Sequence, residues 1–343
     1  MSFPLSPDPW TGLLLADRYC LEGLLGVGGM GRVYRAVDLQ LSTATGQRYV
    51  AIKIMLASLI QDPEACSRFE REVEVALHLQ DQWVVRVLDH GLTPIHWGPP
   101  PPAAHESAEV VLTEGWQGSP FLVMEYVEAP TLERILAEQG RLSVSRTLRL
   151  ARHIGVALRA AHTGVMLEGQ VVQVVHRDLN PSNIFVLEGS RGRETVKLGD
   201  FGLAKFVGEI DTGGLVTRGL LWGTLTYASP EQFRGGERID GRSDIYSLGG
   251  ILYEMLVGTN CFGLPEDTPT EQWLHAHLTR PPDPFPESLK IPEFVQQIIL
   301  KCLQKDSDQR YASITDLDLD LQRAQQRLST HRYTYPGSLT ATG

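Results

Sequence analysis

The strongest constraint on the fold is a change of secondary-structure pattern near Val127–Thr131. Before this point, Tyr19–Leu25, Arg32–Asp38 and Tyr49–Met55 mix β-branched or aromatic residues with turn residues between them, which predicts strands. After it, Leu142–His162 carries apolar residues at helical spacing. Strands grouped before helices indicate an α+β chain rather than the alternating units of a parallel-sheet protein.

One helix and one insertion are expected inside the β-rich part. The apolar residues of Arg68–Leu79 fall on one helical face. The segment Thr93–Ser119 contains four consecutive prolines, Pro99–Pro102, which remove backbone donors and exclude a helix or an inner strand. We predict a surface insertion there, and both a plain loop and a proline-rich partner motif fit it.

The chain therefore divides into a β-rich part, residues 1–127, and a helical part, residues 128–328. Apolar residues from Leu317 to Leu328 recur at helical spacing and predict a C-terminal helix. Residues 329–343 have no such pattern and are expected to form a frayed tail.

Charge and composition exclude several classes of protein. With 31 basic and 41 acidic residues, the net charge of -10 argues against nucleic-acid binding through the overall field. No signal-peptide pattern opens the chain, and no uncharged apolar run approaches the ~18 residues that span a bilayer. The four cysteines form no CxxC pair, so neither a zinc site nor a disulfide framework is indicated. A cytoplasmic protein with reduced thiols and no membrane segment is expected.

A glycine-rich motif, Gly-Val-Gly-Gly-Met-Gly-Arg-Val, occupies residues 26–33. Its glycines lack the Cβ atoms that keep a backbone away from phosphate groups. Because the motif lies between two predicted strands rather than before a helix, it favours a hairpin lid over a nucleotide, not a dinucleotide-binding turn. Taken alone, an ordinary glycine-rich hairpin fits equally well.

A lysine, Lys53, lies near the end of the apolar strand Val50–Lys53. About twenty residues after the lid, its ammonium group is placed to reach the α- and β-phosphates of a nucleotide. A cation on an apolar strand needs a partner, and Glu72 in the following helix is the best candidate. The motif alone leaves a solvated strand edge, with Glu72 paired to Arg68, as an alternative.

Two further motifs carry hard oxygen ligands and a proton acceptor. The run His176–Asn183 contains Asp178, which can accept the proton of an attacking hydroxyl group. Asn183, and Asp200 before Phe201-Gly202, supply oxygens of the kind that Mg²⁺ prefers. Transfer of a γ-phosphoryl group needs mainly positioning and charge neutralisation, which this set provides.

These motifs together resemble a bacterial eukaryotic-like (Hanks-type) serine/threonine protein kinase, over about Tyr19 to Leu328. The resemblance implies a two-lobed protein kinase fold, with a β-rich N-lobe containing one main helix and a mainly helical C-lobe. It also implies ATP and Mg²⁺ as cofactors, and protein serine or threonine hydroxyls as substrates. Some members of the family pair through the N-lobe, so the resemblance is compatible with a homodimer.

The resemblance also implies roles for individual residues. Lys53 and Glu72 would form the ion pair of the active state, Asp178 would be the catalytic base, and Asn183 and Asp200 would hold magnesium. Met124 would be the gatekeeper beside the adenine-binding hinge, and Phe201 would set the in or out state of the metal-binding turn. The implied nucleotide-binding residues are Leu25, Gly26, Val27, Gly28, Gly29, Met30, Gly31, Arg32, Val33, Ala51, Lys53, Met124, Glu125, Tyr126 and Val127.

Further matches follow the catalytic motifs. Ser229-Pro230-Glu231 resembles the Ala-Pro-Glu that closes the activation segment, and Glu231 would pair with Arg310. If that pair is buried, losing one partner would cost on the order of 3–5 kcal/mol. In the family, the residue matching Asp244 holds the backbone of the catalytic loop. Gly223, Thr224 and Tyr227 match the segment that receives the substrate residue.

Activation by phosphorylation is expected because Arg177 precedes the catalytic aspartate. A phosphate group can order a loop by pairing with arginine. The segment offers Thr212, Thr217, Thr224 and Thr226, of which Thr217 is our prediction for autophosphorylation and Thr224 the one expected to be structural.

Two departures from the family pattern stand out. Asn180 replaces the usual lysine, so a positive charge near the transferred group is missing, and we predict a slow but real kinase. The alternatives are a pseudokinase acting as a nucleotide-sensing scaffold, which Asn180 favours, and a small-molecule phosphotransferase, which the match at Gly223–Glu231 disfavours. The second departure is an apolar stretch, Met166–Val174, which predicts an additional hairpin on the C-lobe and suggests partner docking as a role.

Overall fold

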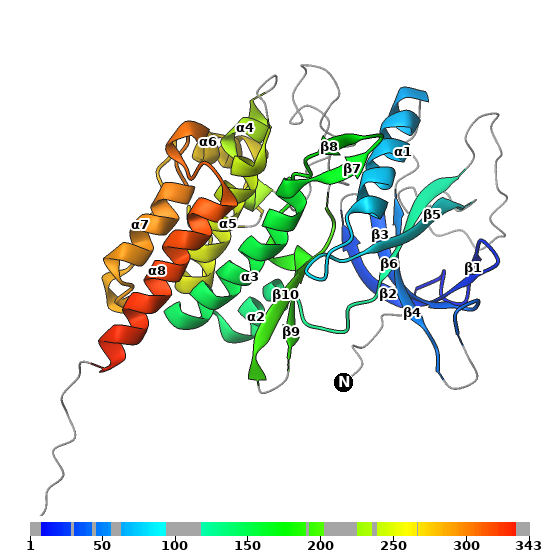
Figure 1. The fold of residues 1–343 in the computed structure, drawn as a ribbon, viewed down its shortest axis with the longest axis horizontal. Helices are drawn as coiled ribbons and strands as arrows, with labels where there is room; N and C mark the ends of the chain where they lie inside the picture. The colour runs from blue at the N-terminus through cyan, green and yellow to red at the C-terminus, as the bar shows by residue number, and fades with distance from the viewer. Residues whose placement is uncertain are drawn as a thin grey trace, which may run out of the picture.

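The computed structural model has two lobes, a β-rich N-lobe and a mainly helical C-lobe (Figure 1). It describes residues 8–28, 31–42, 46–55, 63–93, 118–189, 192–201, 225–234, 239–265 and 267–333; the side chains of 63–66, 68, 72 and 331–333 are not described. The proline-rich segment 94–117 and most of the activation segment, 202–224, therefore lie outside the described residues.

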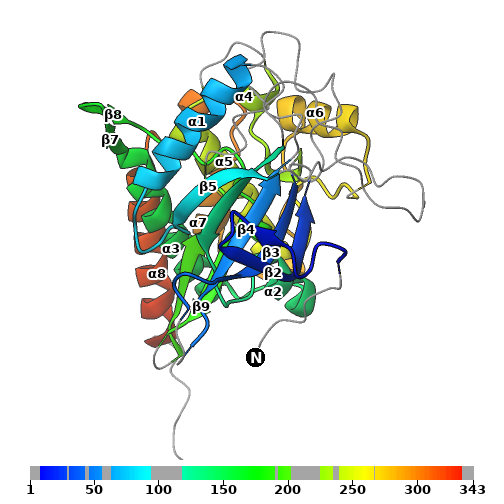
Figure 2. The same ribbon diagram turned by 90° about the vertical axis from the view of Figure 1, so that its right-hand side faces the viewer.

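The N-lobe is built on one six-stranded antiparallel sheet (Figures 1 and 2). The three strands predicted from the first third of the chain are all confirmed. One helix, α1 (Pro63–His78), accompanies the sheet. In spatial order the strands are β1 (Leu14–Leu15), β2 (Tyr19–Gly28), β3 (Gly31–Asp38), β4 (Tyr49–Met55), β6 (Ser119–Glu125) and β5 (Val87–Thr93).

Strand alternation divides the N-lobe side chains between two faces. Tyr34, Ile52 and Phe121 are fully or almost fully buried in a small apolar cluster on one face. Because successive side chains of a strand point to opposite faces, Lys53 projects to the other side from Ile52, toward Asp200. The hydrophobic alternation of the strand thus decides where its lysine points.

The C-lobe is mainly helical, and its centre is α5 (Gly241–Val257), which is buried without interruption from Ser243 to Tyr253. A helix that is apolar on most of its faces is expected to be enclosed by others, and α3 and α7 pack against it. The other helices are α2 (Leu132–Gln139), α3 (Val144–Thr163), α4 (Pro230–Phe233), α6 (Thr270–Thr279), α7 (Glu293–Cys302) and α8 (Ile314–Tyr333).

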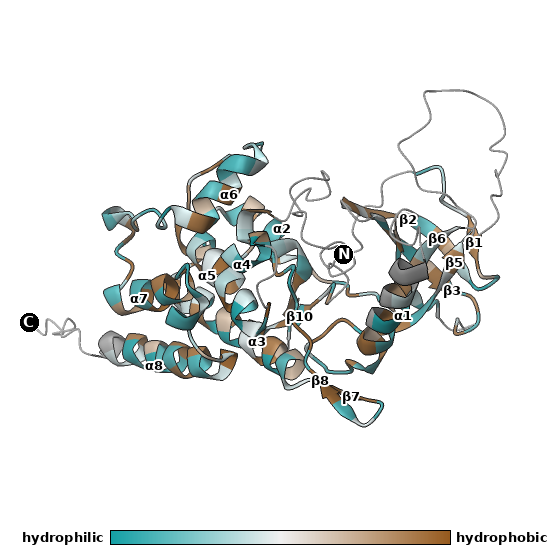
Figure 3. Cartoon of the chain, turned by 90° about the horizontal axis from the view of Figure 1, so that it is seen from above, coloured by the Kyte–Doolittle hydropathy of each residue, from teal (hydrophilic) through white to brown (hydrophobic). Residues whose placement is uncertain are grey.

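Two small antiparallel sheets complete the C-lobe. One pairs β9 (Ile184–Glu188) with β10 (Glu194–Leu198) directly after the catalytic loop. The other is the additional hairpin predicted from the sequence, β7 (Val165–Leu167) with β8 (Gln170–Val172). It projects beside α1, with apolar residues in both strands (Figure 3), and its β7 contacts that helix.

Two further outcomes concern the end of the chain and the thiols. Helix α8 continues to Tyr333, so the first residues of the predicted tail are helical. Cys20, Cys261 and Cys302 are free thiols, and the latter two are buried. Among the helices of the described residues, none combines the length and the apolarity needed to cross a membrane.

Candidate active site

One buried carboxylate, that of Asp244, fixes the backbone at the start of the predicted catalytic loop. Asp244, in the first turn of α5, accepts hydrogen bonds from the backbone N–H groups of His176 (2.8 Å) and Arg177 (2.9 Å), as the resemblance predicts. Burial on its own would raise the pKa of Asp244, but the bond from His162 Nε2 at 2.8 Å and the charges nearby hold it below its usual value. The carboxylate therefore stays ionised and clamps the loop at its start.

The same loop is joined to the turn that carries Asp200. His176 Nε2 lies 2.8 Å from the carbonyl oxygen of Gly199, and the Gly199 N–H donates to the carbonyl oxygen of Asn183 at 2.9 Å. The ring of Phe201 packs against the imidazole of His176, with centroids 4.4 Å apart. These contacts bring the two sequence-predicted motifs together.

Asp178 is held by two asparagine side chains. The Nδ2 group of Asn180 donates to Oδ1 of Asp178 at 3.0 Å, and that of Asn183 lies 3.3 Å from Oδ2. Both amides also donate to the Asp178 carbonyl oxygen. Asn180 is itself fixed because its Oδ1 accepts from the backbone N–H and the hydroxyl of Ser182. Through these bonds Asn180 caps the 3₁₀ turn Pro181–Asn183. The carboxylate is therefore oriented from both sides.

Lys53 reaches the site from the N-lobe. Its Nζ atom lies 2.9 Å from Oδ2 of Asp200, and the lysine is only 8% exposed. The predicted partner, Glu72, lies on α1, but its side chain is outside the described residues, so that pair stays a prediction. Asp200 has a left-handed backbone, φ 57°, which is uncommon outside glycine and turns its side chain toward the lysine.

The side chains present fit a magnesium ion. Because the Asn183 amide nitrogen is used on Asp178, its Oδ1 is turned elsewhere, and with Asp200 it offers two hard oxygen ligands. Within the described ranges, no three His, Cys, Asp or Glu side chains gather closely enough to hold a metal by themselves. This is the donor set of an ion that takes its remaining ligands from phosphate and water.

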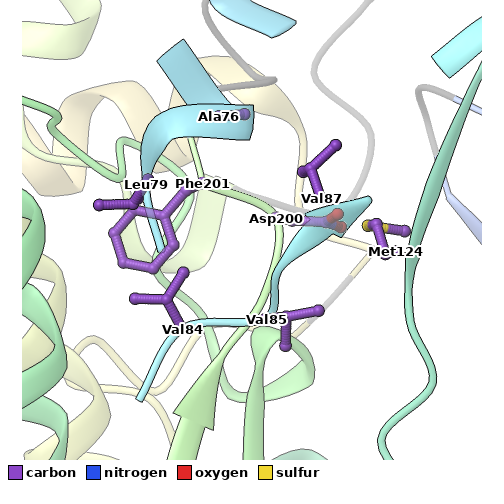
Figure 4. A pocket seen from close by; sticks show the side chains of 8 residues that line it. All are labelled: Ala76, Leu79, Val84, Val85, Val87, Met124, Asp200 and Phe201. Atoms are coloured by element: carbon purple, nitrogen blue, oxygen red, sulfur yellow. The ribbon is translucent and has the colours of Figure 1, made fainter. Parts of the chain in front are cut away.

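A small pocket lies behind this group, under α1 (Figure 4). Met124 closes it toward the hinge, and Phe201, 7% exposed, lies between α1 and the catalytic loop while the carboxylate of Asp200 faces the other way. The turn that carries Asp200 thus presents its carboxylate to Lys53. The lining residues are Ala76, Leu79, Val84, Val85, Val87, Met124, Asp200 and Phe201.

Comparison with known proteins decides the family. The profile described as "Protein kinase domain" matches residues 19–321. The chain belongs to the protein kinase domain family. The relatives described next are bacterial serine/threonine-protein kinases.

Three curated relatives illustrate the similarity. Serine/threonine-protein kinase A of Synechocystis sp. is 36% identical over 312 residues, which are 90% of this chain and 54% of the relative. The kinase pkn3 of Myxococcus xanthus is 32% identical over 320 residues, which are 92% of this chain and 51% of the relative. PknB of Mycobacterium tuberculosis is 33% identical over 313 residues, which are 90% of this chain and 43% of the relative. The chain thus spans about half the length of these relatives. The solved PknI kinase domain of Mycobacterium tuberculosis matches its fold with a TM-score of 0.59 at 21% identity, covering 91% of this chain and 98% of that one.

The segment predicted to form the adenine-binding hinge carries a contact that the sequence did not predict. The carboxylate of Glu125 accepts from Nζ of Lys197 on β10 and, at 3.1 Å, from the backbone N–H of Arg86. The first hinge residue is therefore tied to the C-lobe through its side chain, while its predicted role concerns adenine. No spacing in the sequence links β6 to β10, so only the fold reveals this contact.

The predicted nucleotide lid is an antiparallel hairpin in the described residues, and its pairing register shifts between Leu24 and Gly26. Val27 pairs with Arg32 and Gly28 with Gly31 next to the tip, residues 29–30, which is outside the description. A Cβ atom at Gly31 would lie 2.0 Å from the carbonyl oxygen of Ile54, so only glycine fits there. Arg32 and Tyr34 lie on the same face of β3. Asp8 pairs with the guanidinium group of Arg32 and accepts a hydrogen bond from the hydroxyl of Tyr34.

The C-terminal anchor of the activation segment agrees with the predicted pattern. Glu231 pairs with Arg310 at 2.7 Å, and both side chains are buried. No pattern in the sequence pointed to Gln232. Its Nε2 donates to the carbonyl oxygen of Arg177 at 2.7 Å, and its Oε1 accepts from the backbone N–H and the hydroxyl of Ser229. This glutamine joins the end of the activation segment to the residue that precedes Asp178.

Proposed function

We propose that this kinase transfers the γ-phosphoryl group of Mg-ATP to serine or threonine hydroxyl groups of proteins. The observation that supports this proposal best is the position of Asp178. Its carboxylate accepts hydrogen bonds from two asparagine amides and lies in the same site as the Lys53–Asp200 ion pair. Two hydrogen bonds of Gly199 join these groups, since its carbonyl oxygen contacts His176 Nε2 and its N–H donates to the Asn183 carbonyl oxygen. The names of the bacterial relatives support the same reaction class.

In the proposed reaction, the hydroxyl oxygen of the substrate bonds to the γ-phosphorus while the bond from that phosphorus to the bridging oxygen of ADP breaks. Asp178 accepts the hydroxyl proton, and the two amide donors keep its carboxylate aimed at that proton. Lys53 binds the phosphates from the N-lobe side. Asn183 and Asp200 would hold Mg²⁺, which neutralises charge on the phosphate oxygens.

The lysine-to-asparagine departure sets the expected rate. Asn180 supplies no charge, and its amide is engaged with Asp178 and Ser182. One missing charge-assisted contact to the transferred group costs about 2–4 kcal/mol of transition-state stabilisation. We therefore propose a slow kinase, and the same residue supports the second candidate, a nucleotide-sensing scaffold with weak activity.

Phosphate transfer to a generic protein acceptor distinguishes these two functions. Asp178→Asn is expected to abolish transfer while Mg-ATP still raises the melting temperature. Asp318→Asn, which breaks an ion pair with Arg152 on the far side of the C-lobe, is the matched control and is expected to transfer normally. Nucleotide binding without any Asp178-dependent transfer would favour the scaffold.

Regulation by autophosphorylation is part of the proposal, with Thr217 as the site. This residue lies outside the described part of the chain, so its support is the position of Arg177 before the catalytic aspartate. Mass spectrometry after incubation with Mg-ATP is expected to find phosphate within residues 208–226. Phosphate found only elsewhere would reject the switch. Since ATP is a cytoplasmic metabolite, we propose that the reaction takes place in the cytoplasm.

A further inference from the structure

A short segment before the family match, residues 8–18, packs against the N-lobe. The match begins at Tyr19, so this segment is additional to the kinase domain. Its β1 strand pairs with the start of β2, Leu14 opposite Cys20 and Leu15 opposite Tyr19. Leu15 is 2% exposed and belongs to the apolar cluster of the N-lobe sheet. In Figure 2 this dark-blue segment lies against β2 and β3.

Asp8 is the polar centre of the segment. Its Oδ2 accepts from the guanidinium group of Arg32 at 2.7 Å, and its Oδ1 accepts from the hydroxyl of Tyr34 at 2.9 Å and the backbone N–H of Trp10 at 3.0 Å. The Asp8 side chain is only 5% exposed. A buried carboxylate that accepts hydrogen bonds on both oxygens is held firmly, because breaking the contact would leave the buried donors without acceptors.

Trp10 closes the contact from a second side. Its indole lies 5.4 Å from Cζ of Arg32 and 5.9 Å from the ring of Tyr34. The guanidinium group is therefore held between a carboxylate and an aromatic face, and both interactions are stronger where water is partly excluded. We call Asp8, Trp10 and Arg32 the N-terminal latch.

The position of the latch along the glycine-rich hairpin gives it a role. Arg32 pairs with Val27, one rung from the last described rung at the tip, Gly28 with Gly31. The other end of the segment is fixed at the base of the same hairpin by the β1–β2 pairing. The segment thus spans the lid from base to tip and ties it on the face away from the nucleotide cleft.

We propose that Asp8 and Trp10 are positioning residues, which hold the glycine-rich hairpin in the conformation that binds the phosphates of ATP. This inference rests on the proposed kinase function. A glycine-rich hairpin has unusual conformational freedom, so an untied lid must be ordered each time nucleotide binds. Arg32, expected from the sequence to contact nucleotide, acts in this proposal through its guanidinium group on the latch.

Hydrogen exchange on the full chain without nucleotide tests the latch independently of catalysis. Asp8→Asn is expected to speed exchange of amides in residues 24–34 about tenfold, as loss of a charge-assisted hydrogen bond implies. Asp89→Asn is the matched control, since Asp89 accepts from Tyr19 and Arg18 at the base of the same hairpin. It is expected to leave exchange near the tip unchanged.

Steady-state kinetics provide the second readout. For Asp8→Asn, the KM for ATP is expected to rise about threefold or more, with kcat within about twofold of the unchanged protein. Trp10→Ala is expected to act in the same direction, and it decides the question if Asp8→Asn does not fold. Unchanged exchange in residues 24–34, an equal KM rise in Asp89→Asn, or loss of folding in both latch variants would overturn the proposal. If exchange responds but no variant or unchanged protein transfers phosphate, the latch stands and the proposed function fails.

Discussion

Replacing Arg310 by methionine is expected to destabilise the C-lobe by about 3–5 kcal/mol, the cost of leaving one half of a buried ion pair. The guanidinium group is fully buried, and the carboxylate of Glu231 is 7% exposed. Two bonds of 2.7 and 2.8 Å join them, and the remaining Arg310 donors reach three carbonyl oxygens, those of Gln304, Arg242 and Lys305. Methionine keeps most of the volume but strands the carboxylate and these carbonyl groups.

The measurement is thermal and chemical denaturation of the full chain, followed by circular dichroism. The expected decrease in melting temperature is on the order of 10 °C. Arg323→Met is the matched control, because Arg323 forms a 2.8 Å pair with Asp320 at 71% exposure. Surface pairs contribute about 0–1 kcal/mol, so this control is expected to leave the melting temperature nearly unchanged.

A double-mutant cycle tests the reasoning behind the number. Glu231→Gln alone leaves the buried arginine without its countercharge, whereas the double variant Glu231→Gln with Arg310→Met leaves no buried charge. The double variant is therefore expected to lose less stability than the sum of the two single variants. A loss below about 1 kcal/mol in Arg310→Met, or full additivity in the cycle, would refute the buried-pair argument.

Four further outcomes are expected. Gln232→Leu, which removes the hydrogen bond to the Arg177 carbonyl oxygen, should lower kcat about tenfold with little change in the KM for ATP, as measured by steady-state transfer. Asn180→Lys should raise kcat by restoring a charge near the transferred group; an unchanged or lower rate contradicts this. Gly164→Ala should lower the free energy of unfolding by about 1–3 kcal/mol, because φ is 89° and the new Cβ atom would lie 2.7 Å from the Val172 carbonyl oxygen. Burial on its own would raise the pKa of Glu231, but the bonds and charge of Arg310 hold that pKa below 4.5. The ionised carboxylate should therefore stabilise the fold fully above pH 4.5, and this stabilisation should be lost as the pH falls through the lowered pKa. Denaturation measured across this pH range checks it.

The catalytic loop was predictable because its chemistry is local. Asp178, Asn180 and Asn183 lie within one short turn, and the structure joins their side chains by hydrogen bonds that such spacing allows. The strands, the α1 and α3 helices and the β7–β8 hairpin were predictable for a similar reason, since hydrophobic periodicity acts over a few residues. Glycine in the lid was informative because its conformational freedom is a property of the residue itself.

The partners of charged side chains were much less predictable. Lys53 and Asp200 are 147 positions apart, and Glu125 and Lys197 are 72 apart. Family resemblance led to the Glu231–Arg310 pair, but no pattern in the residues pointed to Gln232 beneath Arg177. A side chain of given charge fits many partners on paper, and burial and distance select among them only after the chain has folded.

The sequence by itself determined the order of strands and helices, the β-rich and helical halves, and the motifs from which we propose the phosphoryl-transfer residues. Only the tertiary structure decided that Asp200 pairs with Lys53 and that Asp8, which precedes the kinase domain, pairs with Arg32 in the glycine-rich hairpin. The physical reason is range: backbone propensity and hydrophobic spacing act between near neighbours, whereas ion pairing depends on which distant groups packing brings together and shields from water.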